Sequence, residues 1–279
     1  MPHLKLDHHT LHYTTVGSPN APPLLMLHGF LGSSQDFSAV LPALSQYFYC
    51  ITPDVSGHGE TLTTSGYYTF SATAQALVDL LDHLDIAKAH LLGYSMGGRL
   101  ALYLACQWPE RFASVILESA SPGLKTAEKR RLRVEKDEAI ARKIETLSLP
   151  IFLSQWYEND LFSSLKNHPE QRQQMLNRRL KNRSADLACA LRGLGTGCQP
   201  SLWQRLEQLR CPLCLLVGEK DEKFVAIAQK IRTLCSQEIA LRIIEGCGHN
   251  IHLESPDEYT RQVVELMLSR NKSCAKKMP

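Results

Sequence analysis

The sequence has little that would point to a membrane, a nucleic acid or a metal. No apolar run approaches the roughly 18 residues that a membrane-spanning helix needs. The first residues lack the apolar stretch of a secretory signal, so we expect a cytoplasmic protein without membrane insertion. The charge excess is small, with 31 Lys and Arg against 28 Asp and Glu, which disfavours a nucleic acid as partner.

The nine cysteines lack the pattern of disulfides or metal ligands. Their number is odd, and reduced cysteines of this kind usually pack in the core. The cysteines that lie in apolar stretches are Cys50, Cys106, Cys189, Cys214 and Cys235. Cys211 and Cys214 have the CxxC spacing, but no second pair completes a zinc site. We therefore expect no metal.

Short apolar runs alternate with longer helical patterns, which predicts an α/β fold with a mostly parallel sheet and helices on both faces. Strands are expected at residues 24–27, 48–53, 89–92, 114–118, 212–217 and 241–245. Helices are expected at residues 68–84, 96–108 and 223–234 and from Pro256 to about Arg270. Residues 271–279 form an expected polar tail.

The alternation of strands and helices stops after Glu118 and resumes near residue 210. Residues 121–209 show helical periodicity and no convincing strand. This predicts one structural domain, in which residues 1–120 and 210–279 form the core and residues 121–209 form an inserted helical cap.

The clearest chemical signal is the string GYSMG at residues 93–97. It lies between an apolar strand and a helical run, which is the context of a nucleophile elbow. The flanking glycines allow a sharp turn, and Ser95 then projects at a helix N-terminus that favours negative charge. We expect Ser95 to be catalytic.

A catalytic serine needs a base, and eleven histidines are available. His249 follows the last predicted strand, on a loop at the same edge of the sheet as Ser95. His28 and His58 more plausibly structure loops, and the remaining histidines lack a comparable setting. Those in the N-terminal segment, expected at the surface, are His3, His8, His9 and His12.

The third member of such a set is a carboxylate that fixes the imidazole tautomer. Asp221 directly follows a predicted buried strand, and the order Ser95, Asp221, His249 is the order found with this type of elbow. Glu118 ends an earlier strand and could substitute, and Glu219 and Glu222 are near neighbours of Asp221. We favour Asp221.

An oxyanion hole needs a second backbone N–H besides that of Met96. The string HGFLG at residues 28–32 follows a predicted strand, and Phe30 is its candidate donor. Together with the string DVSGHG at residues 54–59, these segments resemble the α/β-hydrolase superfamily. The resemblance implies a helical cap inserted after the sixth strand.

Arg99 places a cation in the first turn of the helix that follows Ser95. This opposes the helix dipole at a cost of a few tenths to about 1 kcal/mol, and the i, i+4 spacing puts it on the face of Ser95. One interpretation is that Arg99 forms a salt bridge at the surface and has no role in function. The alternative is a guanidinium that holds a substrate carboxylate.

Positive charge is concentrated in the predicted cap. Residues 121–200 hold 15 Lys and Arg against 9 Asp and Glu, whereas acidic residues are in excess elsewhere. A solvated helix face accounts for several of these charges. A basic cap over the catalytic residues also suits a small anionic substrate.

Five strings carry a more specific resemblance: GYSMGGR at 93–99, SPGL at 121–124, GTGCQPSLW at 195–203, GEKDEKF at 218–224 and GHNIHLE at 248–254. The set is similar to the 2-succinyl-6-hydroxy-2,4-cyclohexadiene-1-carboxylate synthase family of menaquinone and phylloquinone biosynthesis. The resemblance covers residues 28–256 and is weakest in the insertion.

The resemblance implies a lyase without a cofactor that acts on a small-molecule carboxylate. It would eliminate pyruvate from 2-succinyl-5-enolpyruvyl-6-hydroxy-3-cyclohexene-1-carboxylate, with Ser95 as general base. Substrate contacts, carried over by matching position, would come from Tyr94, Arg99, Arg133, Trp156 and Arg179. The register in the cap is open, because other arginines adjoin Arg133 and Arg179, and Trp156 equally suits plain packing.

Two other functions fit the same residues. A carboxylesterase or a carbon–carbon bond hydrolase of this fold would use Ser95 in hydrolysis. A ligand-binding protein without catalysis is disfavoured by the complete set of serine, acid and histidine. An Arg99→Ala variant separates the first two functions, since hydrolysis of a neutral ester does not need that cation.

Overall fold

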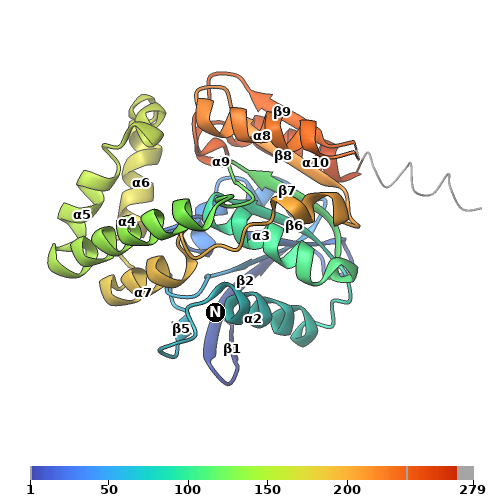
Figure 1. Cartoon of the computed structure of the whole chain (residues 1–279). Helices are drawn as coiled ribbons and strands as arrows, with labels where there is room; N and C mark the ends of the chain where they lie inside the picture. Colours follow the sequence, from blue (N-terminus) through green and yellow to red (C-terminus); the bar gives the residue numbers. More distant parts are fainter. Residues whose placement is uncertain (1, 237, 269–279) are drawn as a thin grey trace, which may run out of the picture.

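The computed structural model describes residues 2–236 and 238–268, and their strands form one sheet (Figure 1). The strands are β1 (His3–Lys5), β2 (His9–Val16), β3 (Pro23–Leu27), β4 (Tyr49–Pro53), β5 (Leu62–Thr63), β6 (Ala89–Tyr94), β7 (Phe112–Glu118), β8 (Leu213–Gly218) and β9 (Ala240–Ile244). Their order is β1-β2-β4-β3-β6-β7-β8-β9, with β5 paired to β2. Neighbours from β4 to β9 are parallel, so their carboxyl ends share one edge.

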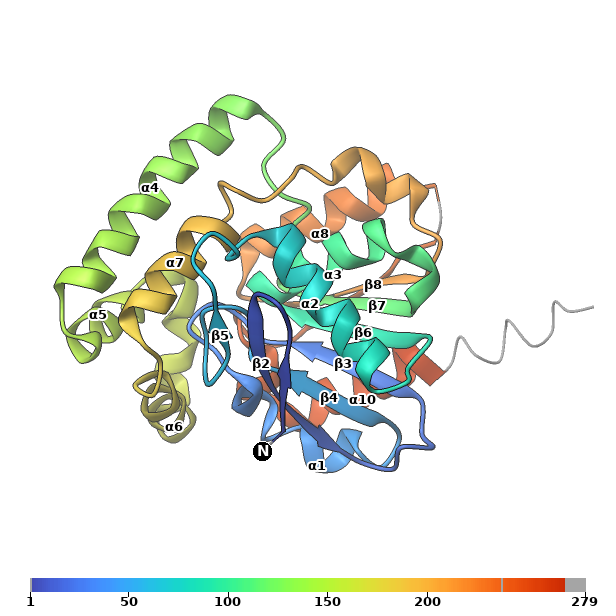
Figure 2. The same cartoon turned by 90° about the horizontal axis from the view of Figure 1, so that it is seen from below.

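Helices cover both faces of this sheet, as predicted (Figure 2). One face packs against α2 (Phe70–His83), α3 (Met96–Gln107) and α8 (Glu222–Leu234). The other face packs against α1 (Leu41–Leu44) and α10 (Pro256–Leu268). The two layers of helices therefore close a hydrophobic core on each side of the strands.

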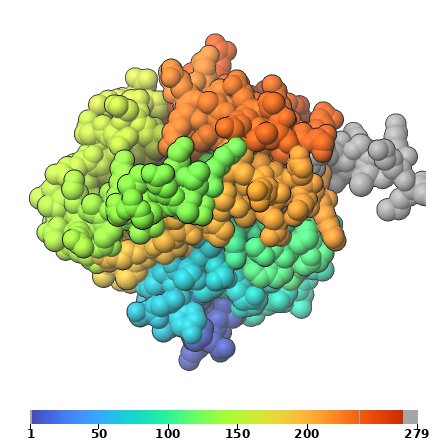
Figure 3. Space-filling model, in the orientation of Figure 1, coloured from blue at the N-terminus to red at the C-terminus, as the bar shows by residue number. Residues whose placement is uncertain are grey.

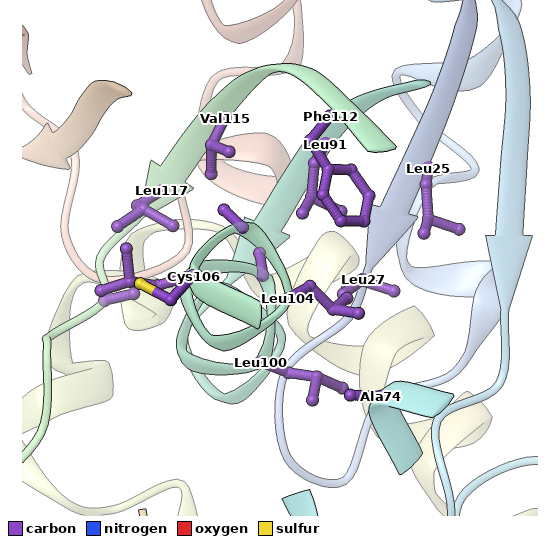
Figure 4. Close-up of a cluster of buried hydrophobic side chains, with 14 of the residues drawn as sticks. Leu25, Leu27, Ala74, Leu91, Leu100, Leu104, Cys106, Phe112, Val115 and Leu117 are labelled. Carbon is purple, nitrogen blue, oxygen red and sulfur yellow. The ribbon is translucent and has the colours of Figure 1, made fainter. Parts of the chain in front are cut away.

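Alternate residues of each strand supply the two cores, because side chains along a strand point to opposite faces. Leu25 and Leu27 lie in the core beneath α3, whereas Leu24 and Met26 lie in the core on the other face. Figure 4 shows the first of these cores, including Leu25, Leu27, Leu91, Leu100, Leu104 and Leu117. Full burial of each such leucine contributes about 1.5–3 kcal/mol, which fixes the strand ends that carry the site.

The cap follows β7 as a set of helices at one side of the sheet (Figures 1 and 2). Its elements are α4 (Ala127–Thr146), α5 (Leu149–Trp156), the 3-10 helix η3 (Asp160–Asn167), α6 (Pro169–Arg179) and α7 (Ser184–Leu194). They share a hydrophobic core with Leu31 and Leu253 of the body. The chain then returns along the body, where Leu202 and Leu206 join the core beneath α3. β7 is the sixth strand if the two-residue β5 is set aside.

The six predicted strands correspond to β3, β4, β6, β7, β8 and β9 to within two residues at each end. The sequence pattern does not predict β1, β2 or β5. The expectation that His9 and His12 lie at the surface is wrong, because both belong to β2 and are 5% and 2% exposed. Asp54 accepts a hydrogen bond from Nδ1 of His12 at 2.7 Å, which explains how a polar strand is buried.

The predicted helices correspond to α2, α3, α8 and α10, and Leu268 is the last described residue of α10. Arg270 and the predicted tail at 271–279 lie outside the described residues. Of the five cysteines expected in the core, Cys189 is half-buried and the others are buried. Within the described residues, no helix is both long and apolar enough to cross a bilayer.

Candidate active site

Ser95 lies in a strained turn between β6 and α3. Its backbone has φ +50° and ψ −107°, in the left-handed half of φ space that a non-glycine residue rarely adopts. Such conformations cost about 1–3 kcal/mol and concentrate at functional sites. A side chain at Gly97 would collide with the carbonyl oxygen of Leu27, and one at Gly93 would lie 2.6 Å from the backbone nitrogen of Gly98. Gly93 therefore lets β6 approach α3, and Gly97 lets α3 approach the end of β3, which together form the elbow.

The structure brings Ser95, His249 and Asp221 into hydrogen-bonding contact. Nε2 of His249 lies 3.0 Å from Oγ of Ser95, and Nδ1 of His249 lies 2.6 Å from Oδ2 of Asp221. The three residues follow β6, β9 and β8, whose carboxyl ends share one edge of the sheet. This geometry lets His249 donate from Nδ1 to Asp221 and accept the hydroxyl proton of Ser95 at Nε2.

The other carboxylates considered for the third position have different partners. Glu118 is fully buried and accepts hydrogen bonds from the backbone of Ile251 at 2.8 Å and from Nδ1 of His252 at 2.8 Å. Glu219 accepts a hydrogen bond from the backbone N–H of Gly246 at 3.0 Å. Neither contact involves His249, so the geometry supports Asp221. Glu118 instead ties the end of β7 to α9 (Ile251–Glu254), next to the loop that carries His249.

His28 is the first residue of the predicted oxyanion loop, His58 lies in the loop after β4, and both are buried. Nε2 of His28 accepts a hydrogen bond from the backbone N–H of Val55 at 2.9 Å, and Nδ1 of His58 lies 3.1 Å from the carbonyl oxygen of Ser56. The two rings pack edge to face, 5.2 Å apart. These contacts hold the loop after β3 against the loop after β4. The two histidines therefore structure loops, as predicted from the sequence.

We expect His58 to make the protein less stable in mild acid. Burial and the nearby His28 lower the pKa of His58 to about 3. The unfolded chain, with a histidine pKa of about 6.5, therefore binds a proton that the folded protein excludes as the pH falls below 6.5. One such group reduces the free energy of unfolding by about 2 kcal/mol between pH 7 and pH 5.

Urea unfolding of the wild type and of His58→Gln at several pH values measures this effect. The variant should lose a smaller part of its stability between pH 7 and pH 5 than the wild type does. Equal losses in the two proteins would show that His58 does not titrate in this way.

The predicted oxyanion donors lie beside Ser95. Met96 is the first residue of α3, and Phe30 lies in the loop after β3. Within residues 2–236 and 238–268, the backbone N–H groups of Phe30 and Met96 have no hydrogen-bond acceptor. Both residues line the same cavity as Ser95. Two such donors beside a catalytic serine can stabilise a developing negative charge.

A cavity of about 480 Å³ opens in front of Ser95, between the cap and the carboxyl edge of the sheet. Among the described residues that line the cavity, none is acidic and seven are basic. The basic residues are Arg99, Lys125, Lys129, Arg133, Arg179, Lys223 and Lys230. Some of these come from the cap and others from α3 and α8. The cavity therefore suits a small molecule with several negative charges.

Arg99 lines the cavity without a carboxylate partner among the described residues. Its Nη1 donates to the carbonyl oxygen of Leu194 at 2.9 Å. Burial and the neighbouring charge of Arg133 lower the pKa of Arg99 to about 10. A cation that is desolvated and repelled in this way is stabilised by a bound anion.

The arginines predicted in the cap have different surroundings. Arg133 donates from Nε to Asp137 at 2.7 Å. Arg179 is 2% exposed and forms a two-pronged pair with Asp36, with Nη2 at 2.8 Å from Oδ2 and Nη1 in contact with Oδ1. Tyr157 accepts a third hydrogen bond, at 3.2 Å from Nε of Arg179. Arg179 therefore borders the cavity while it binds a carboxylate of the protein.

The two aromatic residues predicted to contact a substrate also border the cavity. Trp156 packs against the rings of Phe30 and Phe152, with centroids 5.6 and 5.7 Å away. The ring of Tyr94 lies 5.4 Å from that of His249, and burial raises the pKa of its hydroxyl well above the usual value. Tyr94 therefore remains a neutral hydrogen-bonding group beside His249.

Sequence reasoning missed two features of the site. It did not single out the four lysines of the cavity, although Lys223 and Lys230 are two helical turns apart and so share a face of α8. It also missed Asp36, whose contact with Arg179 joins segments 143 residues apart. No local pattern signals such a contact.

Comparisons with known proteins agree with this geometry. Residues 22–256 match the model of the alpha/beta hydrolase fold family. A protein of Escherichia coli O1:K1 / APEC named 2-succinyl-6-hydroxy-2,4-cyclohexadiene-1-carboxylate synthase is 33% identical over 240 residues, or 86% of this chain and 91% of that protein. A Bacillus subtilis (strain 168) protein with a provisional assignment to the same synthase is 39% identical over 255 residues, or 90% and 92% of the two chains.

A solved structure extends the similarity to three dimensions. MenH from S. aureus superimposes with a TM-score of 0.86 at 32% identity, covering 95% of this chain and 100% of that one. The likeness therefore includes the cap and the body alike.

Proposed function

The chain belongs to the 2-succinyl-6-hydroxy-2,4-cyclohexadiene-1-carboxylate synthase family on the α/β-hydrolase fold, and from that premise we propose how its residues act. The protein is a lyase of menaquinone and phylloquinone biosynthesis. It eliminates pyruvate from 2-succinyl-5-enolpyruvyl-6-hydroxy-3-cyclohexene-1-carboxylate. The product is 2-succinyl-6-hydroxy-2,4-cyclohexadiene-1-carboxylate.

The names of substrate and product define the bonds that change. A base removes the proton at C2, next to the succinyl ketone, and a C2–C3 double bond forms. The C3–C4 double bond shifts to C4–C5, and the bond between C5 and the enolpyruvyl oxygen breaks. The enolpyruvate becomes pyruvate when it takes up a proton. The electrons balance without an oxidant or reductant, so we propose that the enzyme works without a cofactor.

Ser95 is the general base in this proposal. As its hydroxyl takes the C2 proton, it passes its own proton to Nε2 of His249, which lies 3.0 Å away. Asp221, at 2.6 Å from Nδ1, stabilises the imidazolium that forms. No covalent intermediate is needed, because the leaving group departs from carbon and no acyl group is transferred.

The backbone N–H groups of Phe30 and Met96 form the oxyanion hole. Removal of the C2 proton delocalises charge onto the oxygen of the adjacent succinyl ketone. Two preorganised donors at this oxygen stabilise the charge as it develops. Tyr94, Arg99, Arg133 and Trp156 contact the substrate from the cavity wall, and Arg179 borders the cavity with its charge balanced by Asp36.

The cytoplasm is the compartment that best fits the thiols. Eight described cysteines are free, and thiols stay reduced in that compartment. This location is part of the proposal.

One observation carries the proposal: the triad faces a cavity whose described lining includes seven basic side chains and no acidic one. A hydrolase of neutral esters would gain nothing from the desolvated guanidinium of Arg99, which has no carboxylate partner among the described residues. A substrate with several carboxylates gains charge-assisted hydrogen bonds from this group and from the lysines of the cavity.

Arg99→Ala is expected to lower kcat/KM for pyruvate release by about 10–100-fold, the usual worth of a hydrogen bond to a charged group. The free energy of unfolding should fall little, because the change also removes a cation from the first turn of α3. A coupled assay for pyruvate measures the effect, with the spontaneous rate subtracted.

Arg131→Ala is the matched control, since Arg131 is an exposed cap residue paired with Glu135 and lies outside the cavity lining. It should retain the wild-type rate. Turnover of simple esters by the wild type without pyruvate release above background would contradict the proposed function.

A further inference from the structure

Four lysines form the outer part of the cavity wall. Lys125 and Lys129 belong to the segment that leads from β7 into α4, and Lys223 and Lys230 belong to α8. The start of α4, in green, lies beside the orange segment of α8 at the surface (Figure 3). Within residues 2–236 and 238–268, these four side chains have no carboxylate partner within ion-pair distance.

One face of α8 extends from the catalytic triad to the outer end of the cavity. The ring of Phe224 packs 4.8 Å from the ring of His249. Ile227 and Lys230 lie further along the same face and also line the cavity. Seven residues of helix rise about 10 Å, so Lys230 lies about that far along the axis from Lys223, away from the triad.

Trp203 joins the two sides of this outer region. Its Nε1 donates to the carbonyl oxygen of Gly123 at 2.8 Å, which fixes the indole against the segment that carries Lys125. Nζ of Lys125 lies 4.4 Å from the indole centroid, and Nζ of Lys230 lies 5.8 Å from it. Two ammonium groups from different elements therefore lie close to one aromatic ring.

Two neighbouring cations without an anion repel each other. Partial desolvation lowers the pKa of Lys125, and the charge of Lys230 acts in the same direction. The side chains could move apart into solvent, yet both stay over Trp203, where cation–π attraction holds them. A carboxylate between them would relieve the repulsion and form two charge-assisted hydrogen bonds.

The cavity thus contains an inner cationic group, Arg99 and Arg133, and an outer one, Lys125 and Lys230. Such a division suits a ligand with two carboxylates joined by an apolar spacer. The succinyl chain is the longest arm of the substrate, and two methylenes separate its ketone from its terminal carboxylate. These methylenes would lie along the indole of Trp203.

We propose that Lys125, Lys230 and Trp203 form an outer subsite that binds the terminal carboxylate of the succinyl chain. This proposal rests on the proposed function for the identity of the ligand. It assigns these residues to binding alone, since the proton transfer takes place at Ser95.

Calorimetric titration with two aromatic probes tests the subsite without turnover. The first probe is 2-(3-carboxypropanoyl)benzoate, which has the same side chain on a ring that also bears a carboxylate. The second is 2-butanoylbenzoate, which ends in a methyl group in place of the distal carboxylate. The wild type should bind the first about tenfold more tightly than the second, because the distal carboxylate gains charge-assisted hydrogen bonds.

The double variant Lys125→Met/Lys230→Met should bind both probes with equal affinity, at the level of the wild type with the second probe. Lys143→Met/Lys181→Met is the matched control: it removes two exposed cap lysines that lie outside the cavity lining and should keep the tenfold preference. All the titrations, with both probes and all three proteins, use the same ionic strength.

A wild type without preference overturns the proposal, as does a Lys125→Met/Lys230→Met variant that keeps it. Equal loss of preference in the control variant would reduce the effect to net charge and would also overturn the proposal. The pyruvate assay decides the proposed function separately, because a protein that failed to release pyruvate could still discriminate between the probes.

Discussion

Ser95→Ala should lower the rate of pyruvate release by about 10³-fold, within the range that a positioned general base contributes. The substitution removes the oxygen 3.0 Å from Nε2 of His249 and leaves His249 paired with Asp221. Binding of the substrate should persist, because the cations of the cavity are unchanged. Single-turnover measurement of pyruvate, corrected for the spontaneous rate, gives kcat apart from binding.

Ser95→Gly separates the loss of chemistry from any loss of fold. Glycine adopts φ +50° without strain, so this variant should be inactive and yet more stable than the wild type by up to about 1 kcal/mol. Intact-protein mass spectrometry of the wild type during turnover should show no adduct. A covalent intermediate on Ser95, or an active Ser95→Gly variant, would contradict the role of a general base.

The arrangement of the proposed catalytic residues could be predicted because their signals are local. Ser95 needs glycines at 93 and 97, and the close approach of Gly97 to Leu27 shows why. His249 and Asp221 each follow a buried apolar strand, and parallel strands bring their carboxyl ends to one edge. Sequence order and strand ends therefore sufficed to place three residues that are 154 and 28 positions apart.

The N-terminal strands could not be predicted for a physical reason. β2 carries His9 and His12 in a segment rich in threonine, so it lacks the apolar run of the central strands. It is buried nonetheless, because Asp54 satisfies His12 and because β4, β1 and β5 all pair with it. A polar residue is buried when a distant partner satisfies it, and that partner is invisible to local pattern.

The charges of the cavity also depend on distant contacts that the sequence pattern does not reveal. Net charge along the chain located a basic cap, but Lys223 and Lys230 come from the body, and Arg179 of the cap is paired. Whether a cation is free or neutralised depends on contacts across the fold. The positive charge that a substrate would meet is therefore that of a few cations of the cavity, from cap and body, that have no carboxylate partner among the described residues.

Asp36→Asn is expected to have the largest effect on stability. The carboxylate of Asp36 and the guanidinium of Arg179 are each 2% exposed, and they join the turn after the loop at residues 28–32 to α6 of the cap. Removal of one charge leaves the other buried and unpaired, which costs about 3–5 kcal/mol. Arg179 keeps the pKa of Asp36 below its usual value, so Asp36 is ionised at neutral pH. Loss of its negative charge should therefore lower the free energy of unfolding by this whole amount. Urea unfolding at pH 7 measures the change.

The double variant Asp36→Leu/Arg179→Met identifies the cause. It removes both charges, so it should recover most of the stability that the single variant loses, since an apolar pair can replace a buried ion pair at little cost.

Glu135→Gln is the control, because Glu135 pairs with Arg131 at 60% and 64% exposure, where an ion pair contributes less than about 1 kcal/mol. A loss below 1 kcal/mol in Asp36→Asn, or a double variant no more stable than the single one, would contradict this account. The buried ion pair between Asp36 and Arg179 would then not be what holds this part of the body against α6.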